Sequence, residues 1–240
     1  GDRAGAAVTT GTNNTLIGAL AGDALTVSVD NVAVGGSALS LDTKGQNSVA
    51  IGAGALQTQN FTTATNAYNV AVGRSAGTAI TTGIKNVVVG ALALDAATTG
   101  QENVAIGHQV LTADTKGQRN VAVGANALDA QNFTTATNSY NTAVGHAAGG
   151  AVSTGINNTI IGGLAGGTTT TGVQNTLVGA SVNVDAAGSN NCVGMGFNIT
   201  AAAGFTTFGI DASDIRAAHG TATGAAVSDE RYKKDIVDST

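Results

Sequence analysis

Asn120-Val121-Ala122-Val123-Gly124 is the clearest copy of a five-residue motif that recurs along most of the chain. Four residues before each motif glycine stands an asparagine, except that Ser48 takes this place before Gly52. The intervals are mostly 17 residues, twice 21 and finally 15, and the glycines are Gly18, Gly35, Gly52, Gly73, Gly90, Gly107, Gly124, Gly145, Gly162, Gly179 and Gly194. A nearly constant period of this length is typical of a solenoid in which each repeat forms one turn.

The motif reads as a short β-strand with two apolar faces. The residue before each glycine is always Val or Ile, and the residue two places earlier is Val or Thr in nearly every repeat. Residues two apart lie on one face of a strand, and the residue between them, mostly Ala, lies on the other. The many Gly and β-branched residues make a helix unfavourable. We therefore predict an all-β fold, a parallel β-solenoid of about eleven turns.

A strand that is apolar on both faces is usually buried on both. One face can fill the interior of its own turn, whereas the other needs a partner that one thin chain does not provide. The sequence thus predicts association of several copies. A net charge of −5 gives no support for nucleic-acid binding. The sequence shows no apolar run long enough to cross a membrane. The single cysteine, Cys192, is expected in the core, and no cofactor is expected.

The motif divides the chain into four parts. Residues 1–13 form an entry segment, and residues 14–194 form the solenoid. Residues 195–227 break the motif and contain Phe197, Phe205 and Phe208, which indicates a cap or neck that closes the solenoid. Residues 228–240 are distinct because charged side chains suddenly become frequent.

The two 21-residue repeats contain an insertion, and residues 59–66 return unchanged as residues 131–138. Each of these repeats carries one Phe and one Tyr, namely Phe61 with Tyr68 and Phe133 with Tyr140. Loops on a rigid scaffold often carry binding residues, so these four aromatics are candidates for receptor contact. The alternative is that the rings fold back and pack within the loop or between chains.

Other polar residues do not form a recognisable catalytic or metal-binding pattern. His108 and His146 occupy equivalent positions two turns apart, about 10 Å by strand spacing, which is too far to share a metal ion. The acids Asp42, Asp95, Asp114 and Asp129 are scattered and do not form the carboxylate pair of a glycosidase. No metal site and no multiple-turnover enzyme activity is predicted.

The run Ser228-Asp229-Glu230-Arg231-Tyr232-Lys233-Lys234-Asp235-Ile236 resembles the start of the intramolecular chaperone autoprotease found at the C-termini of phage endosialidases and tail fibres. The resemblance implies that Ser228 is a nucleophile and Lys233 its general base, with Asp229 and Arg231 as supporting residues of the motif. The bond between Ser228 and Asp229 would then be cut once, after the chaperone has assembled a trimer. Residues 228–240 would be the start of an incomplete chaperone domain.

The solenoid motif, above all Asn47-Ser48-Val49-Ala50-Ile51-Gly52, is similar to the head repeat of trimeric autotransporter adhesins. That resemblance implies a left-handed parallel β-roll in which three chains pack side by side. Because those repeats are shorter, the 17-residue repeat implies a larger corner or a different cross-section.

Taken together, these features predict a homotrimeric segment of a phage tail fibre or spike in the virion. Its partners would be other tail components and a glycan or protein receptor on the host surface. Two alternatives remain open. One is the head of a trimeric autotransporter adhesin on the bacterial outer surface, and the other is a non-catalytic part of a glycan-degrading tailspike.

Overall fold

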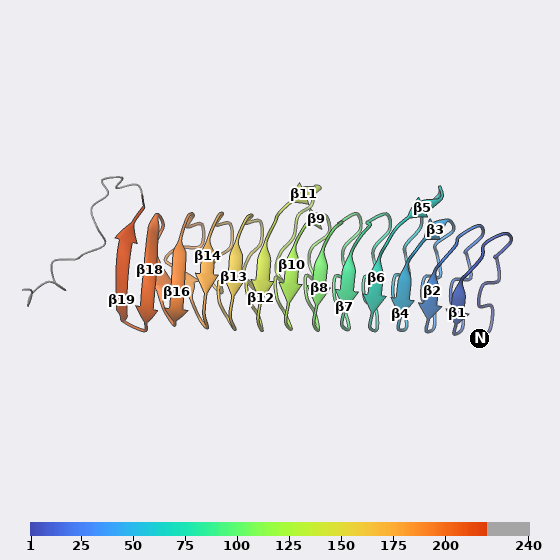
Figure 1. Cartoon of the computed structure of the whole chain (residues 1–240), viewed down its shortest axis with the longest axis horizontal. Coiled ribbons are helices and arrows are strands. Elements are labelled where there is room, and N and C mark those ends of the chain that lie inside the picture. Colours follow the sequence, from blue (N-terminus) through green and yellow to red (C-terminus); the bar gives the residue numbers. More distant parts are fainter. Residues whose placement is uncertain (220–240) are drawn as a thin grey trace, which may run out of the picture.

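The structure is a computed structural model that describes residues 1–219. Within this range the chain is all-β with no helix, and its parallel strands stack into a β-solenoid of about 12 turns. The turns follow one another about every 17 residues, which confirms the predicted solenoid and its period. Figure 1 shows the result as a rod, with the strands in one row from the N-terminal to the C-terminal end.

The main sheet runs along the whole rod and is built from the repeated motif. Each strand of the motif pairs with the equivalent strand of the next turn, so that Val121 lies beside Val104 and Thr142. All neighbours are parallel except the last pair, which is antiparallel. In order across the sheet, the 13 strands are β1 (Thr15–Ile17), β2 (Val32–Val34), β4 (Val49–Ile51), β6 (Val70–Val72), β7 (Val87–Val89), β8 (Val104–Ile106), β10 (Val121–Val123), β12 (Thr142–Val144), β13 (Thr159–Ile161), β14 (Thr176–Val178), β16 (Val193–Phe197), β18 (Phe205–Ile210) and β19 (Ser213–Ala218).

Three two-stranded sheets lie outside this row, formed by β3 (Gly45–Gln46) with β5 (Thr65–Asn66), β9 (Gly117–Gln118) with β11 (Thr137–Asn138), and β15 (Asn183–Val184) with β17 (Thr200–Ala201). The first two contain the insertions of the 21-residue repeats. In Figure 1 the loops at β5 and β11 protrude beyond the other turns. The insertions are therefore local excursions that leave the main sheet unbroken.

The core lies inside the solenoid and consists of small and medium aliphatic side chains. The middle residue of the motif strands from β2 to β14 points inward, as Ala105, Ala122 and Ile160 do, and is fully buried, whereas Leu16 of β1 is partly buried. The alanine three residues after a motif glycine is also buried, for example Ala127. Bulk is supplied mainly by leucines such as Leu128. The narrow interior explains why the sequence contains few large side chains.

The motif asparagines form a buried hydrogen-bond ladder that connects successive turns. Asn86 illustrates it: its Oδ1 accepts from the backbone N–H of Asn103 at 3.0 Å, and its Nδ2 donates to the carbonyl of Gly100 at 2.9 Å. The same two bonds recur at most motif asparagines from Asn14 to Asn175. The exceptions precede the two insertions: Ser48 replaces the asparagine, and Asn120 accepts from the backbone N–H of Asn141 while its Nδ2 donates to Asn103 Oδ1. These asparagine side chains thus bond to buried backbone N–H and carbonyl groups at a corner of the turn, which the parallel sheet leaves without hydrogen-bond partners.

The motif glycines stack directly on one another at the opposite end of each strand. Gly124 has a φ of 126°, and a Cβ atom added to it would lie 2.4 Å from the carbonyl oxygen of Gly145. Only glycine tolerates both the backbone conformation and this close approach.

The last repeat has a different register from the one expected. Val193 pairs with Thr176, Met195 pairs with Val178, and the backbone N–H of Cys192 donates to the Asn175 side chain. Cys192 therefore takes the position of the motif asparagine, and the motif glycine is Gly196. The prediction that Gly194 is the last motif glycine is wrong, because Gly194 lies only 15 residues after Gly179, whereas Gly196 keeps the 17-residue interval and the strand register. Cys192 is fully buried, as predicted.

The sheet also extends beyond both expected ends of the solenoid. Residue 194 falls inside β16, and β18 and β19 continue the same sheet through residues that were predicted to form a cap. At the N-terminal end, the backbone of Gly5 and Ala7 bonds to the following turn at Ala21 and Asp23. Residues 1–13 are therefore packed as part of the stack.

Candidate interaction surface

The outer side of the main sheet carries an unbroken column of apolar side chains, here called the outer column. It contains the Val or Ile before each motif glycine and continues into the last three strands. Its members are Ile17, Val34, Ile51, Val72, Val89, Ile106, Val123, Val144, Ile161, Val178, Met195, Phe208 and Ile215. Each pairs with the next in register, so the column runs the length of the sheet.

These side chains are open to solvent in the single chain. Ile106 is 37% exposed and Ile161 39%, whereas Ala105 and Ile160, which precede them and point inward, are fully buried. The residues two places earlier in each strand, such as Val104 and Thr159, form a parallel half-buried row. Parallel sheets are normally covered on both faces, and large contiguous apolar patches on a protein surface usually mark an interface. The second apolar face predicted from the sequence is thus present and uncovered by residues 1–219.

A polar column, which the sequence reasoning did not find, runs along one edge of this face. In every turn the residue just before the motif asparagine has a left-handed backbone, for example Lys85, Glu102, Arg119 and Tyr140, with φ values of 60°, 59°, 62° and 48°. These positions are polar in all turns, at Asn13, Asp30, Asn47, Tyr68, Lys85, Glu102, Arg119, Tyr140, Asn157, Gln174 and Asn191. The column could have been predicted from the sequence, because the residue before the motif asparagine is polar in every turn.

Four members of this polar column form a connected network. Arg119 Nε donates to Glu102 Oε2 at 2.8 Å, and Arg119 NH1 donates to the Tyr140 hydroxyl at 2.7 Å. Lys85 Nζ lies 3.8 Å from Glu102 Oε1. The hydrogen bond from Arg119 lowers the pKa of Glu102, with its charge and that of Lys85 contributing. Because the network is exposed to solvent, its ion pairs should contribute little to the stability of the fold. Its hydrogen bonds instead hold the Arg119 side chain between Glu102 and Tyr140.

The candidate aromatics of the insertions separate into two groups. Phe61 and Phe133 are only 6% and 7% exposed, so both rings pack within their own chain. Tyr68 and Tyr140 are about half exposed and belong to the same polar column. Lys85, Glu102 and Arg119 lie between them, so the two tyrosines are about 19 Å apart along the rod. The structure therefore does not bring the four aromatics together.

A buried carboxylate anchors each insertion. Asp114 Oδ1 accepts from the backbone N–H of Gly117 at 2.9 Å and of Phe133 at 3.1 Å, and its Oδ2 accepts from Gln131 Nε2 at 2.6 Å. Gln131 in turn accepts from the ladder residue Asn141 at 2.8 Å. Burial raises the pKa of Asp114, although these hydrogen bonds oppose the shift. Asp42, Gly45, Phe61, Gln59 and Asn69 repeat this arrangement in the first insertion.

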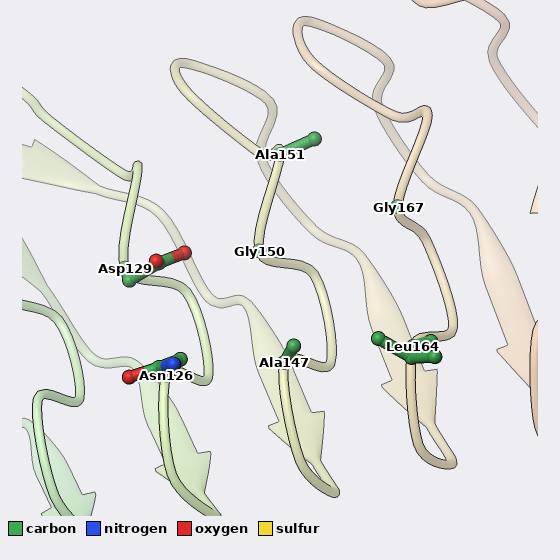
Figure 2. Close-up of a pocket in the computed structure, with 7 residues that line it drawn as sticks. All are labelled: Asn126, Asp129, Ala147, Gly150, Ala151, Leu164 and Gly167. Atoms are coloured by element: carbon green, nitrogen blue, oxygen red, sulfur yellow. The ribbon is translucent and has the colours of Figure 1, made fainter.

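One shallow groove of about 360 Å³ crosses three turns (Figure 2). It exists because the small residues Ala147 and Gly150 lie between Asn126 and Asp129 of one neighbouring turn and Leu164 of the other. Asp129 is the only carboxylate among the residues that line it, so the groove does not contain the acid pair of a glycosidase.

The predicted autoprotease residues Ser228, Asp229, Arg231 and Lys233 lie outside the described residues. No protein-family model matches the chain, and neither a curated protein nor a solved structure is similar to it. In the part of the chain that the structure describes, no helix has the length and hydrophobicity needed to cross a membrane. The fold and the surfaces described above therefore carry the functional argument.

Proposed function

We propose that this chain is a structural and receptor-binding segment of a homotrimeric phage tail fibre or spike that attaches the virion to its host. Three copies would lie side by side with their outer columns facing the common axis. Their polar edges, corners and insertions would then face outward, where host surface glycans or proteins are accessible.

The exposed outer column is the observation that supports this proposal most directly. Thirteen strands at about 4.8 Å extend the face to roughly 60 Å. A face of that length, about 10 Å wide, offers each copy about 600 Å² of mostly apolar surface, which approaches the contribution of one partner to an ordinary protein interface. Enclosing this face between three copies would remove it from water without adding further elements.

The attachment role can be tested by binding of the fluorescently labelled trimer to bacterial cells from the habitat of the phage. We expect saturable binding to some strains and not to others. Periodate treatment of the cells should abolish binding to a glycan receptor, and protease treatment should abolish binding to a protein receptor. A trimer that binds no strain able to adsorb the virion would contradict receptor binding.

We also propose that the fibre matures by a single cut at the bond between Ser228 and Asp229, with Lys233 as the general base. The test compares the wild type with Ser228→Ala, each expressed with the sequence that naturally follows Thr240, on a denaturing gel. Shortening of the wild type alone is expected. Equal lengths of the two proteins would contradict self-cleavage and would favour the adhesin alternative, which has no need of such a cut.

A further inference from the structure

The outer column changes character at the C-terminal end of the sheet. From β1 to β14 it contains only Val and Ile, whereas the last three strands contribute Met195, Phe208 and Ile215. The longer strands β16 and β18 add Phe197 and Ile210, which pair with each other in the next outward-facing position. We call these five residues the C-terminal patch. All are exposed, from 39% for Met195 to 62% for Ile210.

The uniform part of the column leaves the axial alignment of neighbouring copies poorly determined. A shift by one turn, about 4.8 Å, would bring each Val or Ile opposite another Val or Ile. Each such exchange changes the buried surface by one methylene group, about 0.8 kcal/mol, and gains and losses along the column largely cancel. Repetitive sheet faces of this kind need a non-repeating element to specify one register.

The C-terminal patch is such an element. A shift by one turn would replace the partner of Phe208, which is Phe208 of the next copy, by the smaller Met195 or Ile215, and an aromatic side chain buries about 150–250 Å². In parallel copies around one axis, equivalent strands lie at the same height, so the patch of each copy meets the patches of the others. Residues 229–238 are a poor alternative occupant of this apolar patch, because they include seven charged side chains.

We propose that contacts between the C-terminal patches of the copies fix the axial register of the trimer. This inference rests on the proposed trimer and identifies the part of its interface that determines alignment. The repeated face would supply most of the buried area, and the patch would select one alignment among many of similar energy.

The test measures axial alignment in mixed trimers. Gly36→Cys and Gly163→Cys are suitable label positions, because a side chain at either glycine meets nothing within 4 Å. They are seven strand spacings apart in the sheet, about 34 Å along the rod. Cys192 is buried and its thiol pKa is raised to about 11, so labelling should be selective. Co-expression of the two variant chains, each with one introduced cysteine in addition to the buried Cys192, gives trimers with spin labels at both heights, and pulsed EPR measures the distance between them.

A variant in which the C-terminal end matches the repeats, here called the levelled variant, replaces four of the five patch residues by residues typical of the repeats. Its substitutions are Met195→Val, Phe197→Thr, Phe208→Val and Ile210→Thr. Because Val and Thr favour strands, the fold should be retained. We expect one narrow distance in the wild type and additional distances, displaced by about 4 Å on either side, in the levelled variant. The matched control, Ile106→Val with Ile161→Val, also removes apolar groups but should keep the single distance.

A levelled trimer with the narrow wild-type distance would overturn the inference. The same holds if the control loses its single distance to the same extent. If the wild type itself is monomeric, the proposed function fails first, and that result is recognisable from its mass alone. Should the levelled variant lose its far-UV circular dichroism, Phe208→Val alone provides the same comparison with one substitution.

Discussion

At the scale of single residues, two positions of the motif determine the backbone of each turn. The asparagine satisfies buried backbone groups of the next turn, and the glycine permits direct stacking of the corners. Their spacing of four residues defines the strand between them. Both roles follow from hydrogen-bonding capacity and size, so they lead to specific expectations for substitution.

Asn103→Ala should lower the free energy of unfolding by about 1–3 kcal/mol, because it leaves a buried backbone N–H and a buried carbonyl without partners. Chemical denaturation followed by circular dichroism measures the change. The matched control is Asn132→Ala in an exposed loop, which should change the free energy by less than about 0.5 kcal/mol. Equal effects of the two substitutions would contradict the role of the ladder.

Gly124→Ala should destabilise the protein by at least about 3 kcal/mol, because its Cβ would overlap the carbonyl of Gly145 and its φ is unfavourable for alanine. Gly163→Ala provides the control, since nothing lies within 4 Å of an added Cβ. Alanine there should be neutral or stabilising by up to about 1 kcal/mol. Thermal denaturation of both variants gives the comparison, and a stable Gly124→Ala protein would refute the stacked corner.

At the scale of elements, the two insertions depend on buried polar groups that sequence reasoning treated as scattered acids. Asp42 and Asp114 hold the backbone of Phe61 and Phe133, which are themselves buried. The length and position of the insertions could be predicted from the repeat interval. The contacts of these acids with the glutamine and phenylalanine of the insertion could not, because they connect residues in successive turns, and only the solenoid places those residues side by side.

Phe133→Ala should destabilise the second insertion by about 3–5 kcal/mol, since it removes a buried aromatic ring. The matched substitution Tyr140→Ala, at a half-exposed ring, should cost much less. Hydrogen exchange of residues 131–138 measures local opening and should increase for Phe133→Ala in particular. Comparable protection in both variants would contradict the packing of the phenylalanine.

The pH dependence of stability tests the buried carboxylate. Burial raises the pKa of Asp114 above its usual value of 3.8, so the folded protein holds this proton more tightly than the unfolded chain does. The resulting contribution to stability is complete below the unfolded pKa and is lost as the pH rises through the folded pKa. Relative to Asp114→Asn, the wild type should therefore gain stability between pH 7 and pH 4. A difference that stays constant or reverses in denaturant titrations would contradict this.

At the scale of the whole molecule, the sequence predicted the solenoid because alternation of apolar residues and the repeat interval are both local signals. It also predicted an apolar outer face, which the structure contains from Ile17 to Ile215. The register of the last repeat was missed because Cys192 replaces the asparagine on which the alignment depended. The polar column was missed although the residue before each motif asparagine is polar in every turn, whereas the C-terminal patch required the pairing of strands that the motif does not predict.

The central claim is that three copies enclose the outer column. Sedimentation equilibrium of the 240-residue chain, whose mass is 23.2 kDa, tests it most directly. We predict a species with three times this mass, and a monomer once Val89 and Ile106 of the outer column are both replaced by lysine. A wild-type chain that sediments as a monomer at micromolar concentration would contradict the claim.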